Sequence, residues 1–130
     1  MKKLLSILLI SVILFGCGQT AKEYNENGIN YAESEEYQLA IADYTRAIRI
    51  DPDYVDAYHN RGVAYGKLGN YEDAIADYTR FLRINPDYTA AYRNRGVAKK
   101  RAGLSYCSDY KKACDLGDED CCEWYYKQCR

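Results

Sequence analysis

The sequence has few of the residues on which enzyme sites usually depend. Its 130 residues include one histidine, His59, and contain neither a glycine-rich phosphate loop nor a serine-nucleophile motif. General acid–base, phosphoryl-transfer and acyl-transfer chemistry therefore lack their usual groups. The carboxylates are spread along the chain. We therefore expect a protein that is not an enzyme and that needs no cofactor.

An excess of charge of one sign is also absent. The chain has 18 Lys and Arg against 19 Asp and Glu, which gives a formal net charge of −1. Without Lys2 and Lys3 the net charge is about −3. Nucleic-acid binding requires a basic surface that neutralises phosphates. The composition therefore predicts no nucleic-acid partner.

No apolar run is long enough to span a membrane. The longest, Leu4 to Phe15, is interrupted by Ser6 and Ser11 and follows two lysines. Twelve residues rise only about 18 Å as a helix, whereas the hydrocarbon layer is about 30 Å thick. Residues 1–16 are therefore predicted to be an export signal and not a membrane span.

The end of this segment, Leu14-Phe15-Gly16-Cys17, resembles the lipobox of bacterial lipoproteins. The resemblance implies that Cys17 becomes a palmitate-bearing, lipidated first residue, that residues 17–20 form a tether, and that the exported protein is anchored in the cell envelope. The alternatives are ordinary secretory cleavage, which leaves Cys17 as a thiol, or an uncleaved anchor. Gly18 is not the Asp that marks inner-membrane retention in enteric-type bacteria, so the outer membrane is preferred.

The chain repeats itself at an offset of 34 residues. The segment from Ala40 to Arg46 matches the segment from Ala74 to Arg80 at all seven positions, and Pro52 falls on Pro86. A fixed period of this length is typical of stacked structural repeats. The sequence therefore predicts an array of similar units.

The residues at this period resemble those of the tetratricopeptide repeat (TPR), in which aromatic residues, Gly, Ala and Pro recur at fixed spacing. Repeat one supplies Tyr24, Gly28, Tyr31, Ala40, Tyr44 and Pro52, and repeat two supplies Tyr58, Gly62, Tyr65, Ala74, Tyr78 and Pro86. The resemblance implies an all-α helix-hairpin solenoid of about seven antiparallel helices in a right-handed superhelix. Its predicted parts are TPR 1 over 21–53, TPR 2 over 54–87, a degenerate TPR 3 over 88–118 and a capping helix over 119–130.

Within this frame we expect helices near 21–34, 37–50, 55–68, 71–84, 89–102, 105–116 and 119–129. Gly28, Gly62 and Gly96 fall in helix interiors, where glycine is unfavourable, so they predict close approach by a neighbouring helix. Gly69 and Gly103 are expected to end first helices in a left-handed turn.

Two positions depart from the family pattern. The Leu before each of these interior glycines is replaced by Asn27, Arg61 and Arg95, which we expect to loosen one packing contact. In the third repeat Lys99 replaces an aromatic residue, and Asp109-Tyr110 aligns with Asp77-Tyr78 at an offset of 32. We therefore expect the loop between the helices of this repeat to be two residues shorter.

Five cysteines lie close together, at 107, 114, 121, 122 and 129. Exported proteins meet oxidising conditions, which favour disulfides. In an antiparallel helix hairpin, facing residues have numbers with a constant sum, and the pairs Cys107–Cys129 and Cys114–Cys122 share one sum. Both disulfides are therefore predicted. The inner pair also resembles the hairpin disulfides of Sel1-like cysteine-rich repeat proteins.

Cys121 is left without a partner by this pairing. It is a small buried residue, or it forms an intermolecular disulfide or exchanges with Cys122. A cysteine-rich exported domain with a thiol redox or metal-binding role is the alternative function. The sequence has no Cys-x-x-Cys motif and no paired-cysteine zinc module, so no metal site is predicted.

Resemblance to TPR arrays implies that the first helices of successive repeats line a concave groove that binds a protein or peptide partner. The implied partner-binding residues are Asn25, Glu33, His59, Lys67, Arg93, Lys100 and Arg101, with Ile29, Val63 and Val97 between them. The third first-helix is strongly basic, so the hypothesis is a peptide whose acidic segment lies at that end. The alternative is a solvated charged face. The TPR carboxylate clamp is not reproduced, although Asn60 and Asn94 are able to contribute.

Overall fold

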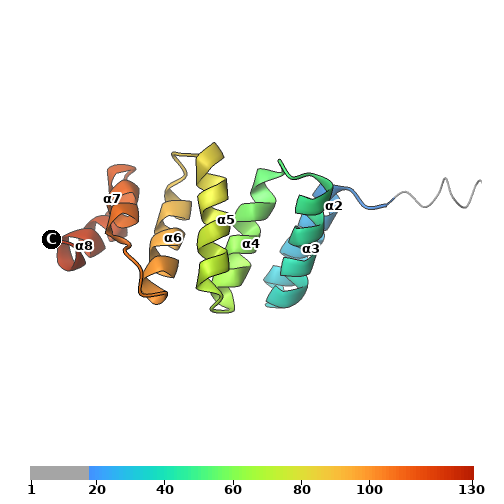
Figure 1. Cartoon of the computed structure of the whole chain (residues 1–130), viewed down its shortest axis with the longest axis horizontal. Helices are drawn as coiled ribbons and strands as arrows, with labels where there is room; N and C mark the ends of the chain where they lie inside the picture. The colour runs from blue at the N-terminus through green and yellow to red at the C-terminus, as the bar shows by residue number, and fades with distance from the viewer. Residues whose placement is uncertain (1–17) are drawn as a thin grey trace, which may run out of the picture.

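The computed structural model describes residues 18–130, which contain seven α-helices and no strand (Figure 1). The helices are α2 (Ala21–Glu33), α3 (Tyr37–Ile50), α4 (Val55–Lys67), α5 (Tyr71–Ile84), α6 (Thr89–Arg101), α7 (Cys107–Asp115) and α8 (Glu119–Gln128). They lie in one row from α2 to α8, each packed on the next (Figure 1). The expected all-α solenoid is confirmed, and the helices begin and end within two residues of the expected positions. None of these helices is both long and apolar enough to cross a membrane.

Local signals start and stop the helices. Thr20 caps α2 by accepting a hydrogen bond from the backbone N–H of Glu23, whose side chain accepts from Thr20 N–H in return. Gly69 and Gly103 end first helices with φ of 78° and 72°, as expected. Glu35 occupies the equivalent place in the first repeat with a φ of 60°.

The three interior glycines lie against tyrosine rings of the next helix. A Cβ added to Gly28 would be 2.5 Å from Tyr44 Cε1, and one added to Gly62 would be 3.0 Å from Tyr78 Cε1. At Gly96 the Cδ1 and Cε1 atoms of Tyr110 would both be 2.7 Å away. The predicted close approach is confirmed at each position, and it sets how tightly the two helices of a repeat pack.

The expectation that Arg61 and Arg95 merely loosen the packing is wrong. Arg61 of α4 donates from Nε and Nη2 to the two carboxylate oxygens of Asp77 in α5, both at 2.8 Å, and from Nη1 to Thr45 in α3 at 3.1 Å. Arg95 makes the corresponding bonds to Asp109 and Thr79. Each arginine thus joins the two helices of its own repeat through a largely buried ion pair. Its hydrogen bond to Thr45 or Thr79 links that repeat to the preceding one.

The expectation of a shorter loop in the third repeat is wrong, because the third repeat is shortened in its second helix, α7. The segment between α6 and α7 covers residues 102–106, which is longer than the corresponding segments 34–36 and 68–70. Helix α7 has 9 residues where α5 has 14. Asp109 is the third residue of α7, whereas its counterpart Asp77 is the seventh of α5. Lys99 Nζ lies 2.9 Å from Asp109 Oδ2 at the place of the missing aromatic residue.

Helices α7 and α8 form the closing hairpin. Disulfides join Cys107 to Cys129 and Cys114 to Cys122, with Cα–Cα distances of 5.7 and 4.5 Å. These are the two pairs that were predicted from the equal sums of their residue numbers. Cys121 is a free thiol with no exposed surface, packed in the core cluster of this hairpin. Burial, followed by the nearby Asp118 charge, raises the pKa of the Cys121 thiol to about 11, so the thiol stays protonated and unreactive near neutral pH.

Candidate functional site

Three surface depressions follow one another along the solenoid, and first helices form their walls. The first lies between α2 and α4, the second between α4 and α6, and the third between α6 and α8. Each contains one of the buried tyrosines that contact the interior glycines, namely Tyr44, Tyr78 or Tyr110. We call this series the groove.

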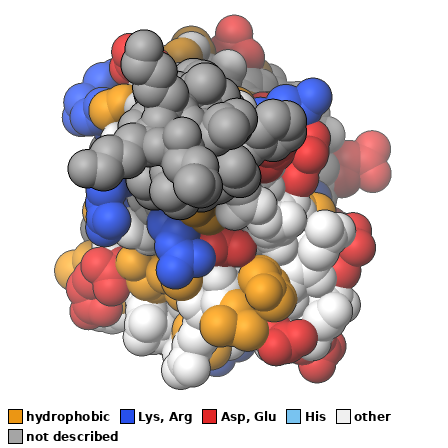
Figure 2. Space-filling view, turned by 90° about the vertical axis from the view of Figure 1, so that its right-hand side faces the viewer, with side chains coloured by type: hydrophobic (Ala, Val, Ile, Leu, Met, Phe, Trp, Pro, Cys, Tyr) orange, Lys and Arg blue, Asp and Glu red, His pale blue; other side chains and the backbone are white. Residues whose placement is uncertain are grey.

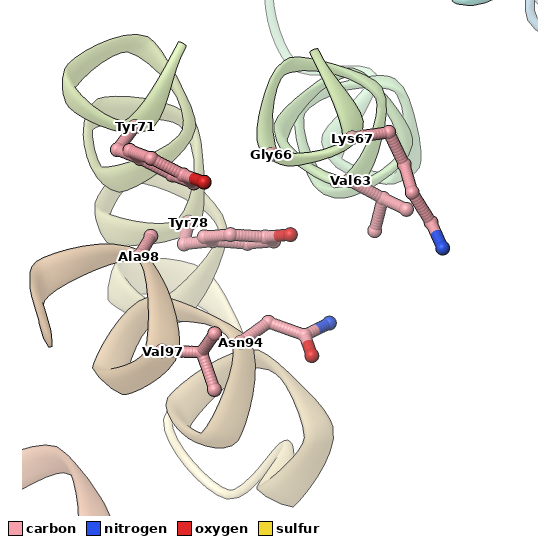
Figure 3. Close-up of a pocket in the computed structure, with 8 residues that line it drawn as sticks. All are labelled: Val63, Gly66, Lys67, Tyr71, Tyr78, Asn94, Val97 and Ala98. Carbon is pink, nitrogen blue, oxygen red and sulfur yellow. The ribbon is translucent and has the colours of Figure 1, made fainter. Parts of the chain in front are cut away.

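The second depression has a volume of about 260 Å³ and is mainly apolar. Tyr71 and Tyr78 extend into it from α5, Val63 borders it from α4, and the Asn94 amide reaches toward it from α6 (Figure 3). Burial raises the pKa of Tyr78 far above its usual value, with a smaller contribution from the Asp77 charge. The phenol therefore remains a hydrogen-bond donor at all physiological pH values.

The first depression repeats this arrangement one unit earlier. Tyr44 takes the place of Tyr78, Tyr37 that of Tyr71 and Asn60 that of Asn94, within a volume of about 300 Å³. Burial, assisted by the Glu33 charge, raises the pKa of Tyr44 to about 12, so this phenol is also a donor. The same chemistry therefore recurs at the repeat spacing.

Lys67 lines both of these depressions, and its ammonium group extends away from the groove floor (Figure 3). Seen from the α2 and α3 end, charged side chains of both signs surround small apolar areas (Figure 2). Exposed glutamates of this end are Glu23, Glu26, Glu33, Glu35 and Glu36. The first repeat is therefore the acidic end of the array.

The third depression combines aromatic and basic groups in a volume of about 580 Å³. Its lining residues are Val97, Lys100, Arg101, Tyr110, Trp124 and Gln128. Lys100 Nζ donates to Gln128 Oε1 at 2.5 Å, and the Tyr106 hydroxyl lies 3.4 Å from the same oxygen. This section therefore has a net positive lining, unlike the two before it.

Four of the seven predicted partner-binding residues, Glu33, Lys67, Lys100 and Arg101, line the groove. The other three, Asn25, His59 and Arg93, share one repeat position and do not line these three depressions, because their side chains contact neighbouring helices and the segments between them. Asn25 is buried and accepts a hydrogen bond from Asn60 Nδ2 at 3.1 Å. Arg93 pairs with the buried Asp118 at 2.5 Å.

The residues that the sequence interpretation missed come mostly from second helices and from α8. They are Tyr37, Tyr44, Tyr71, Tyr78, Tyr110, Trp124 and Gln128. The recurrence of tyrosines at the repeat spacing was a usable signal for the first five. Trp124 lies 32 residues after Tyr92, the position of the first aromatic residue of a fourth repeat, so the offset of 32 was a usable signal for it as well, whereas Gln128 had none.

His59 is packed among aromatic rings. Its ring centre lies 4.9 Å from that of Phe81 and 5.3 Å from that of Tyr88. Its Nε2 atom is buried and has no hydrogen-bond partner in the described part of the chain. Burial lowers the pKa of His59 below its usual value, against smaller opposing contributions from Asn60 and Asp56. His59 is therefore a neutral packing residue.

This environment predicts a pH-dependent stability. The unfolded chain binds a proton at His59 near the ordinary pKa of about 6.5, whereas the folded chain resists protonation until lower pH. The free energy of unfolding should thus be highest above that value and fall as the pH decreases through it. Urea unfolding at pH 8 and pH 5 measures the change, and the variant His59→Phe should show a smaller loss. An equal loss in both proteins would contradict the assignment.

No group of three potential metal ligands gathers within residues 18–130. The predicted export signal (residues 1–16) and the predicted lipidation site at Cys17 lie outside the described residues. The beginning of the predicted tether, at Cys17, does so as well.

Comparisons with known proteins agree with this architecture. A family profile described as TPR repeat matches residues 28–69, and one described as Tetratricopeptide repeat matches residues 55–88. No curated protein sequence gives a match.

Several solved structures resemble the chain closely. The first TPR of Spaghetti (RPAP3) bound to the HSP90 peptide SRMEEVD has 26% sequence identity and a TM-score of 0.74, covering 82% of this chain and 88% of that one. The second TPR of Spaghetti, bound to the same peptide, has 30% identity and a TM-score of 0.71, covering 75% and 93%. The second TPR domain of human RPAP3 in complex with the HSP70 peptide SGPTIEEVD has 27% identity and a TM-score of 0.75, covering 82% and 92%.

Proposed function

We propose that this chain, a member of the tetratricopeptide-repeat family, is a protein–protein interaction scaffold without enzymatic activity. The groove holds a peptide segment of its partner. The observation that carries this proposal is the recurrence of one depression at the repeat spacing, with a buried tyrosine and an asparagine amide in each of the first two copies. Evenly spaced pockets suit an extended chain with evenly spaced side chains.

The groove offers two kinds of contact to such a peptide. The Asn60 and Asn94 amides are suited to pair with its backbone, because an amide both donates and accepts hydrogen bonds. The apolar surfaces of the first two depressions take side chains of the peptide. The relatives bound to SRMEEVD and SGPTIEEVD support a peptide ligand with acidic residues. In this chain the basic groups Lys100 and Arg101 attract that acidic part.

The scaffold is held at the cell envelope through a lipid on Cys17, in our proposal. The support is the lipobox-like sequence Leu14-Phe15-Gly16-Cys17 and the short apolar run before it. Mass spectrometry of the mature protein from membranes tests this: a lipidated Cys17 at the first position is expected. A mature chain that begins elsewhere, or with an unmodified Cys17, would contradict it.

Asn94→Ala should weaken partner binding about tenfold, because one buried amide contact contributes about 1–2 kcal/mol. Crosslinking in intact cells identifies the partner, and titration of its bound segment then gives Kd. Asn30→Ala is the matched control, since Asn30 is exposed and lies on the first helix of another repeat. Equal binding by both variants and the unmodified protein would refute groove binding.

A further inference from the structure

We infer that helix α8 completes a carboxylate-binding section at the basic end of the groove, and that the Cys107–Cys129 disulfide positions this section. The inference rests on the proposed peptide-binding function and adds to it a ligand chemistry and a structural requirement. It concerns the third depression, whose far wall belongs to the closing hairpin.

The lining of the third depression suits an acidic side chain or a peptide carboxylate. Lys100 and Arg101 are its only charged lining residues, and both are exposed. Within residues 18–130 Arg101 forms no ion pair, and Lys100 is bonded to the neutral Gln128. Beside these cations the Tyr110 and Trp124 rings, 5.4 Å apart between centres, provide an apolar platform. Cations beside an apolar surface bind carboxylates more strongly than cations in open water.

Helix α8 is anchored differently at its two ends. At its beginning Asp118 accepts a hydrogen bond from the Cys121 N–H at 2.9 Å and pairs with Arg93 of α6. The Cys121 side chain is fully buried there, and the Cys114–Cys122 disulfide crosses the hairpin next to it. These contacts hold the beginning of α8 in more than one way.

The other end of α8 has fewer attachments. Tyr126 is 56% exposed, and residues 126–128 are all exposed. Trp124 and Tyr125 pack against the core cluster of the hairpin, but after them this end is attached only by the Cys107–Cys129 disulfide and by the hydrogen bonds of Gln128 to Lys100 and Tyr106. A helix of 10 residues is too short to be stable by itself. The Cys107–Cys129 bond therefore fixes the place of Gln128 relative to Lys100, and it supports the Trp124 face, which packs on Tyr110.

The two disulfides provide matched variants. One variant is Cys107→Ser with Cys129→Ser, and the other is Cys114→Ser with Cys122→Ser. Trp124 is the single tryptophan of the chain, so its fluorescence reports ligand at this section directly. The probes are the peptide SRMEEVD and its carboxylate-free counterpart SRMQQVN with an amidated C-terminus, both acetylated at the N-terminus.

We expect the unmodified oxidised protein to bind the acidic peptide about tenfold more tightly than the carboxylate-free one, with a change in Trp124 fluorescence. The Cys107/Cys129 variant should lose most of this preference. The Cys114/Cys122 variant should keep it within about twofold, because Asp118 and Cys121 still hold the beginning of α8. Arg101→Gln, at an exposed site, should reduce the preference without changing the helix content.

Several results would overturn the inference. Equal binding of the two peptides by the unmodified protein would remove the carboxylate section while leaving peptide binding intact. Equal loss in both disulfide variants would remove the special role of Cys107–Cys129, as would global unfolding of the Cys107/Cys129 variant in circular dichroism. Failure of both peptides to bind would overturn the inference, and the Asn94→Ala comparison on the crosslinked partner would then decide separately whether the proposed function also fails.

Discussion

Gly96→Ala is expected to lower the free energy of unfolding by about 2 kcal/mol, the middle of the range for overpacked cores. The added Cβ would lie 2.7 Å from two ring atoms of Tyr110, which is only 2% exposed. The ring is unable to move freely, because it also packs against Tyr106 and Trp124 at centre distances of 5.1 and 5.4 Å. Alanine's better helix propensity, about 1 kcal/mol, only partly offsets the clash. Urea unfolding followed by circular dichroism measures the difference.

Gly66→Ala is the control for this prediction. Gly66 also lies inside a first helix, α4, but a Cβ there would meet nothing nearer than the Tyr78 hydroxyl at 4.0 Å. The substitution should therefore stabilise the fold by about 0.5–1 kcal/mol through helix propensity alone. If Gly66→Ala and Gly96→Ala changed stability equally, close approach would not be the reason for glycine at 96.

The sequence predicted the helices well because three independent signals agree on their positions. The offset of 34 residues places Gly28, Gly62 and Gly96 at one repeat position, and the structure places each against a tyrosine ring. The turn residues Gly69 and Gly103 mark the ends of first helices. Where spacing, turn chemistry and packing all give the same answer, little tertiary information is needed.

The groove was predicted less well because the face of a helix is sensitive to a shift of one residue. Successive residues of an α-helix are about 100° apart around its axis. His59 faces Phe81 and Tyr88, whereas Asn60, one residue later, lines the first depression. An error of one position in assigning the groove face of a helix thus selects a packing residue in place of a groove residue.

The Arg61–Asp77 and Arg95–Asp109 ion pairs were missed for a different reason. Arg61 and Asp77 are 16 residues apart, and Arg95 and Asp109 are 14 apart, so the two pairs do not share one spacing. The two-residue loss at the start of α7 accounts for the difference. A recurring arginine at the position of the family's leucine, followed by a recurring aspartate on the next helix, was the available signal. Because the arginine was interpreted only as the loss of a packing contact, the ion pair that it forms was not predicted.

Arg61→Leu restores the family's usual residue type and is nevertheless expected to destabilise the fold by about 3 kcal/mol, the low end for a broken buried ion pair. Asp77 would be left without its partner, with a side chain only 7% exposed. Burial already raises the pKa of Asp77, and the Arg61 hydrogen bonds and charge oppose that rise, so the variant should raise this pKa further. Chemical denaturation gives the stability, and NMR titration of the Asp77 carboxyl gives the pKa.

Adding Asp77→Ala to Arg61→Leu should recover most of the lost stability, because no buried charge then remains without a partner. Lys111→Ala is a surface control: Lys111 pairs with Asp115 where both side chains are more than half exposed, so unfolding should hardly change. A double variant as unstable as Arg61→Leu would mean that the lost link to Thr45, and not the uncompensated carboxylate, sets the cost. The repeats would then be joined mainly by the Arg61 to Thr45 hydrogen bond, and Thr45→Val should reproduce the defect by itself.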